Sequence, residues 1–137
     1  MAAASRLLFL MRSLNLPRTP VVVAICLAVA ALHLFTGPDY RGPLRAFVTG
    51  YLIDLALPCS LVLLLGVGLD GRPTLRLPAV RATAVFLLGA AVEFLQYLGV
   101  PLFGRTFDPL DLLMYAAGAM AALAFERLVF APYPGAG

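Results

Sequence analysis

The side chains best suited to chemistry in this chain are a few polar residues embedded in apolar surroundings. Asp54 and Glu93 lie inside long apolar runs, and Gln96 follows Glu93 by three residues. A charged side chain within a membrane-spanning helix costs at least a few kcal/mol, so such residues mark either function or a tight pairing. Two neighbouring carboxyl groups in a dry site can share a proton, perform acid–base chemistry or hold a polar ligand.

Several other chemistries find no support in the sequence. It has no glycine-rich phosphate loop, no zinc motif and no serine with a positioned histidine and aspartate. The two cysteines, Cys26 and Cys59, lie in apolar runs and are too few for a disulfide framework or a zinc site. We therefore expect no cofactor, no metal and no dedicated set of catalytic residues.

The composition requires a membrane as the setting for these side chains. Of the 137 residues, 62% are apolar and only 12% are charged, and the mean hydropathy is +0.96. A soluble domain carries about 25% charged residues. All ten basic residues are arginines, spread between the apolar runs, so the net charge of +3 indicates orientation in a bilayer and not a nucleic-acid partner.

Four apolar runs come close to the roughly 20 residues that a spanning helix needs. They cover residues 21–35, 46–69, 82–103 and 110–130. The sequence thus predicts an all-α integral membrane bundle of four transmembrane helices over residues 20–131. Residues 1–19 are expected to form a cytoplasmic interfacial segment, and residues 132–137 a C-terminal tail.

The arginines predict the orientation of this bundle. With the N-terminus inside, seven arginines lie on the inner side and three on the outer side, which favours cytoplasmic N- and C-termini. The inner seven are Arg6, Arg12, Arg18, Arg72, Arg76, Arg81 and Arg127, and the outer three are Arg41, Arg45 and Arg105. The absence of lysine and the wealth of Ala, Leu, Gly, Pro and Arg indicate codons rich in G and C, which favours a bacterial inner membrane.

The four predicted helices bring their polar residues to one depth, in the outer half of the bilayer. Helical spacing puts Glu93, Gln96 and Tyr97 on one face, and Asp111 and Tyr115 on another. His33 is expected at the outer end of the first helix, either at the interface or hydrogen-bonded within the bundle. The residues that we expect to bind a ligand are Asp54, Glu93, Gln96, Arg105, Asp111 and Tyr115.

Two further pairs have structural interpretations. Asp108 and Pro109 form a helix start, with Asp108 as the N-cap and Pro109 at the first helical position. Glu126 and Arg127 are expected to be an exposed pair at the inner surface.

The segment 92–120 resembles the VanZ-like group of small bacterial membrane proteins. The matching positions are Glu93, Gln96, Arg105, Asp108, Asp111 and Gly118. The stretch 49–66, with Asp54 early in the second helix, is similar to a related uncharacterised family of four-helix proteins, a domain of unknown function. Tyr115 stands where VanZ-like proteins usually carry an asparagine, which favours the uncharacterised relative. The resemblance implies four helices and no established reaction.

The sequence leaves four functions open. The leading hypothesis is a non-enzymatic site in the outer leaflet that binds a lipid head group or another amphiphile. The others are a helper subunit whose acids pair with a membrane protein partner or a second copy, proton-coupled transport, and an intramembrane enzyme. That enzyme would act on a lipid-linked substrate, with Glu93 as acid–base and His33 or Asp111 assisting.

Overall fold

The described part of the chain is helical, with connecting turns and no strand. The computed structural model describes residues 17–36, 39–67, 73–100 and 108–130. Its elements are α2 (Arg18–Phe35), α3 (Arg45–Gly50), α4 (Leu52–Leu65), the short 3-10 helix η1 (Pro73–Arg76), α5 (Pro78–Tyr97) and α6 (Pro109–Val129).

Three of these helices, α2, α5 and α6, are long and apolar enough to cross a membrane. Helix α4, with 14 residues, is shorter than a span requires. The predicted second helix over 46–69 is instead two helices, α3 and α4, divided at Tyr51. Gly50 directly precedes the division, and glycine is the weakest helix former apart from proline.

The other helix boundaries follow local chemistry. Helix α5 starts at Pro78, four residues before the predicted apolar run, because proline suits the first helical turn. It ends at Tyr97, before the predicted end at 103, and Gly99 follows in a left-handed conformation with φ of +82°. Helix α4 continues through the buried Pro58.

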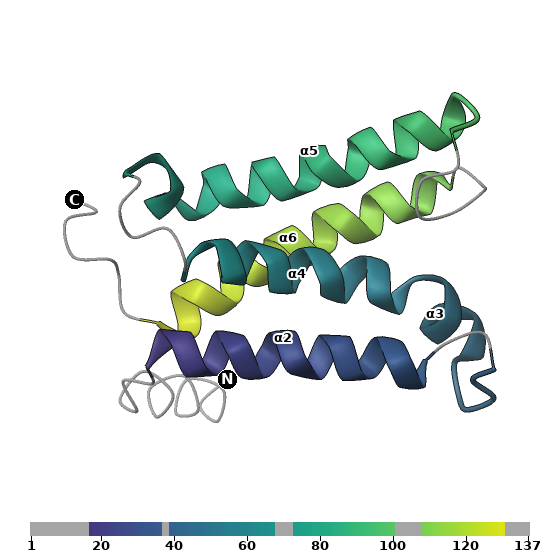
Figure 1. Cartoon of the computed structure of the whole chain (residues 1–137), viewed down its shortest axis with the longest axis horizontal. Coiled ribbons are helices and arrows are strands. Elements are labelled where there is room, and N and C mark those ends of the chain that lie inside the picture. The colour runs from purple at the N-terminus through teal and green to yellow at the C-terminus, as the bar shows by residue number, and fades with distance from the viewer. Residues whose placement is uncertain (1–16, 37–38, 68–72, 101–107, 131–137) are drawn as a thin grey trace, which may run out of the picture.

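The helices alternate in direction and pack side by side (Figure 1). The start of α2 and the end of α6 lie at one end of the bundle, and α3 lies at the other. Helix α4 contacts α2, α5 and α6, and α6 also contacts α5. The centre of the bundle is therefore the α4–α6 pair, with α2 and α5 flanking it.

The distribution of apolar side chains is that of a protein surrounded by lipid. The buried core is small and mostly aliphatic, with residues such as Val22, Val62 and Ala122. In contrast, Leu34 and Phe35 are each 80% exposed, and large apolar side chains are exposed on all the long helices. Apolar surface of that extent marks a membrane-facing or partner-facing surface.

Candidate binding cavity

A cavity of about 860 Å³ lies between α2, α4, α5 and α6, toward the end of the bundle where α3 lies. Residues of α2, α3, α4, α5 and α6 contribute to its wall. They are His33, Thr49, Gly50, Ile53, Asp54, Leu57, Leu88, Val92, Glu93, Gln96, Asp111 and Tyr115. This volume is within the range of small-molecule sites in proteins.

Three carboxyl groups from three different helices line this cavity. Asp54 comes from α4, Glu93 from α5 and Asp111 from α6. Among the described lining residues, His33 is the sole side chain able to carry a positive charge. Carboxyl oxygens accept hydrogen bonds, so the cavity is suited to a ligand that donates them.

Glu93 is the most buried of the three acids, with 2% of its surface exposed. The Tyr115 hydroxyl donates to its Oε1 at 3.2 Å, and the backbone N–H of Asp108 donates to its Oε2 at 3.3 Å. Both donors belong to the first half of α6 or to its cap. A buried carboxyl group needs such partners, and α6 supplies them.

Asp108 connects this network to the rest of the fold. Its Oδ1 accepts a hydrogen bond from the N–H of Leu110 at 2.9 Å, so it caps α6, and Pro109 occupies the first helical position. Its Oδ2 accepts a hydrogen bond from the Tyr51 hydroxyl at 3.2 Å. Asp108 therefore links the junction of α3 and α4, the acid on α5 and the start of α6.

Small residues allow the helices that carry these groups to approach closely. A Cβ atom at Gly89 would collide with the ring of Tyr115. One at Gly118 would collide with the backbone carbonyl of Leu55 on α4. The absence of a side chain at Gly89 thus makes room for the Tyr115 ring beside Glu93. Gly118 brings the backbones of α4 and α6 into direct contact.

The structure brings five of the six predicted ligand-binding residues to this one cavity. They are Asp54, Glu93, Gln96, Asp111 and Tyr115. The sixth, Arg105, lies outside the described residues. Sequence reasoning did not single out Thr49, which also lines the cavity and lies one turn before Ile53. A threonine in an apolar run is a weak signal, because its hydroxyl is often satisfied by its own helix, as here by the Arg45 carbonyl at 2.8 Å.

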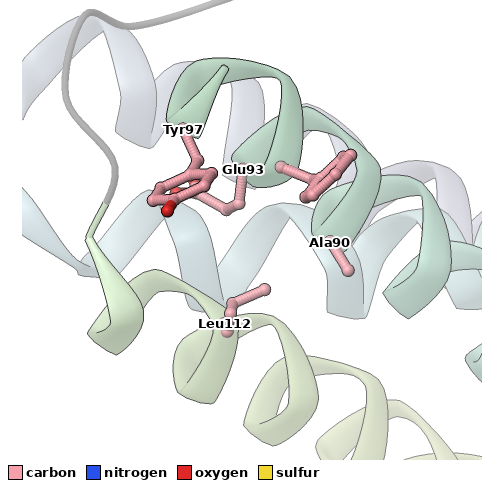
Figure 2. Close-up of a pocket in the computed structure, with 5 residues that line it drawn as sticks. Ala90, Glu93, Tyr97 and Leu112 are labelled. Atoms are coloured by element: carbon pink, nitrogen blue, oxygen red, sulfur yellow. The ribbon is translucent and has the colours of Figure 1, made fainter. Parts of the chain in front are cut away.

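A second, smaller space of about 360 Å³ also borders Glu93 (Figure 2). Ala90, Glu93 and Tyr97 of α5 and Leu112 of α6 line it, together with Phe94. Tyr97 is 69% exposed. Of the three residues predicted to share one face of α5, Glu93 lines both spaces, Gln96 lines the large cavity and Tyr97 lines the smaller space.

The prediction of an exposed Glu126–Arg127 pair is wrong. Glu126 is only 5% exposed and accepts a hydrogen bond from Nη2 of the fully buried Arg81. Arg18 lies 3.6 Å from the other Glu126 oxygen. Of the predicted pair, Arg127 is exposed and Glu126 is not. This ion-paired group joins α2, α5 and α6 at the end of the bundle opposite the cavity.

The same group contains Arg81, which precedes the predicted apolar run 82–103 and yet is helical. Arg81 lies in the first turn of α5, and its Nη1 donates to the Leu75 carbonyl at 2.6 Å and to the Arg76 carbonyl at 3.3 Å. It therefore fixes η1 against α5 in addition to pairing with Glu126. Local spacing carries no signal for this pairing, since Arg81 and Glu126 are 45 residues apart.

Comparison of the chain with protein-family models, curated proteins and solved structures gave no match. The resemblance of segment 92–120 to the VanZ-like group therefore stays a hypothesis. Within the described residues, no group of three or more His, Cys, Asp or Glu side chains is arranged to hold a metal ion.

Proposed function

We propose that the chain binds the polar head group of an amphiphile in its large cavity, without changing the ligand chemically. The observation that carries this proposal is the meeting of Asp54, Glu93 and Asp111, from three helices, at one cavity. The neutral groups of Thr49 and Gln96 add donors and acceptors to the same wall.

The chemistry of the wall favours a head group that donates hydrogen bonds. Ammonium and hydroxyl groups donate hydrogen bonds, which the carboxyl oxygens of the wall can accept. Phosphate and carboxylate groups are anions that accept hydrogen bonds, so ionised carboxylates in the wall would repel them. A bound ammonium head also compensates the negative charge of the cavity carboxylates, which is costly at this depth in a bilayer. We therefore propose an amine- or hydroxyl-bearing head group.

We also propose that the chain crosses the membrane four times, with α3 and α4 together as the second crossing. Only Tyr51 separates them, and the Leu55 N–H still donates to its carbonyl at 3.1 Å. Arg18, Arg76 and Arg127 lie at the end of the bundle opposite the cavity, which supports a cytoplasmic position for that end. The cavity would then open in the outer leaflet of a bacterial inner membrane.

The VanZ-like pattern fits the same proposal. Glu93, Asp108 and Asp111 are positions of that pattern, and all three contribute to the cavity or to the hydrogen bonds behind it. We propose membership of the related uncharacterised four-helix family on this basis.

Binding to the purified protein in phosphatidylcholine nanodiscs tests the proposed function. Three probes share one hydrocarbon chain and differ in the head: hexadecylamine, monopalmitoylglycerol and palmitate. We expect saturable binding of the amine or the glyceride and weaker binding of palmitate. Replacing Asp54→Asn and Asp111→Asn together should weaken amine binding by about tenfold or more, since a hydrogen bond to a charged group contributes about 1.5–3 kcal/mol.

The control is Asp39→Asn, which removes an exposed carboxylate from a loop outside the cavity. It should leave amine binding unchanged. Equal binding of all three probes, or amine binding that the double variant does not alter, would contradict the proposal. Crosslinking of the cavity acids to another protein would then favour a helper subunit.

A further inference from the structure

A third space, of about 310 Å³, lies between α2 and α4 beside the large cavity. Three residues, His33, Ile53 and Leu57, line both spaces, so the two are contiguous. We call the smaller one the α2–α4 groove. Its remaining lining residues are Cys26, Val29, Ala30, Ser60, Leu61 and Leu64.

The groove leads away from the polar cavity toward the middle of the bundle. From Leu57 to Leu64 the lining advances seven residues along α4, which is about 10 Å at 1.5 Å per residue. His33 to Cys26 covers a similar length on α2. The groove therefore runs roughly parallel to the helices, as the hydrocarbon chain of a lipid in the same bilayer would.

The chemistry along the groove changes from polar to apolar. The Ser60 hydroxyl donates to the Leu57 carbonyl of its own helix at 2.8 Å. The Cys26 thiol lies 3.8 Å from the Ser60 carbonyl oxygen, which joins α2 to α4 beside the groove. The polar atoms of these two residues are thus engaged with the protein, and the rest of the lining beyond His33 is apolar.

We propose that the α2–α4 groove holds the hydrocarbon chain of the amphiphile whose head group occupies the large cavity. This inference rests on the proposed function and specifies the ligand as one with a chain attached directly to a donor head. The groove supports that occupant because it adjoins the head-group cavity, with which it shares three lining residues, and because it runs along the helices.

We expect the groove to determine where the hydrocarbon chain lies and to add little to the affinity for the ligand. Lipid tails are as apolar as leucine side chains, so moving a hydrocarbon chain from the bilayer into the groove yields little hydrophobic free energy. The informative measurement is therefore where the chain lies, and not how tightly the ligand binds.

A photolabelling experiment tests the inference. The probe is hexadecylamine with a diazirine near the middle of its chain, bound to the wild-type protein in phosphatidylcholine nanodiscs. Mass spectrometry locates the labelled residues, and excess unlabelled hexadecylamine identifies the saturable fraction. We expect that fraction on groove residues such as Ala30, Leu61 and Leu64, and only unsaturable labelling at lipid-facing positions such as Leu87.

A matched pair of variants sharpens the test. Both Ala30 and Ala31 are exposed residues of α2, but only Ala30 lines the groove. Ala30→Phe therefore adds a ring inside the groove, whereas Ala31→Phe adds the same ring outside it. Ala30→Phe should remove most of the saturable label from α4, and Ala31→Phe should leave it unchanged. The wild-type label map tests the inference even where Ala30→Phe does not fold.

Two results would overturn the inference, and they are distinguishable. Saturable amine binding that depends on Asp54 and Asp111, with the label spread evenly over lipid-facing residues, would reject the groove alone. Amine binding that is neither saturable nor sensitive to these acids would reject the proposed function and the groove together.

Discussion

The Tyr115 hydroxyl lies 3.2 Å from Oε1 of Glu93 and donates a hydrogen bond to it, which joins α6 to α5 through a polar contact in a largely apolar bundle. Gly89 provides the space in which the Tyr115 ring reaches this position. The contact therefore depends on three residues that are separated in sequence, and each can be tested.

We expect Tyr115→Phe to lower the free energy of unfolding by about 1–3 kcal/mol, because it leaves one oxygen of the buried Glu93 without its donor. Glu93→Gln should also destabilise, since its amide oxygen can accept from Tyr115 or from Asp108 but its NH2 cannot accept from either. Chemical unfolding in detergent micelles measures both. The double variant should lower the free energy of unfolding by clearly less than the sum of the two single effects. Strict additivity would show that the residues do not interact.

Gly118→Ala is expected to destabilise the protein by about 1–3 kcal/mol, because the added methyl group meets the backbone carbonyl of Leu55, which cannot move as a side chain can. Gly50→Ala is the matched control. A Cβ atom at Gly50 has no neighbour within 4 Å, so this change should be neutral or stabilise by up to about 1 kcal/mol. Equal thermal shifts for both variants would contradict the close α4–α6 contact.

Arg81→Gln should be among the most damaging single substitutions, at about 3–5 kcal/mol, because it removes the guanidinium bonded to the buried Glu126 and leaves that carboxylate paired with the more distant Arg18. It also disrupts the hydrogen bonds from Arg81 to the carbonyls that precede α5. Arg127→Gln removes the same charge from an exposed position and should change stability by less than about 0.5 kcal/mol. Thermal unfolding of the two variants in the same detergent measures the difference. Similar melting temperatures would show that the buried ion pair does not form.

Asp108→Ala is expected to cost about 1 kcal/mol or more, since it removes the cap of α6 and the acceptor for the Tyr51 hydroxyl together. Asp108→Asn keeps an oxygen for the Leu110 N–H and should restore most of the lost stability. Hydrogen exchange of the first-turn amides of α6 reports the cap directly. Unchanged protection of these amides in Asp108→Ala would argue against the capping role.

Much of the fold was predictable because hydrophobic length and breaker residues are local properties. Pro78 and Pro109 mark two helix starts in the sequence itself. The juxtaposition of Asp54, Glu93 and Asp111 was also predictable, since antiparallel helices put residues at a similar distance from one end of the bundle side by side. The depth of a residue in the bundle does not predict its hydrogen-bond partner. The hydrogen bond from Tyr51 to Asp108 was therefore not predicted from the sequence.

The remaining differences arise from long-range contacts. The division at Tyr51 has only Gly50 as a local signal, and the apolar run continues through it. Glu126 next to Arg127 has the pattern of an exposed pair, and only the position of Arg81, from a distant helix, shows that Glu126 is buried. Periodicity describes which face a residue occupies but not which charged group meets it.

The buried Arg81–Glu126 pair also has a consequence during synthesis. The two residues are 45 positions apart, so at about 5–20 residues per second the ribosome adds Glu126 roughly 2–9 s after Arg81. During that interval the guanidinium of Arg81 cannot pair with Glu126. Arg81 lies in the first turn of α5, where a long side chain can reach the water interface, so the unfinished chain can keep the guanidinium hydrated until α6 arrives.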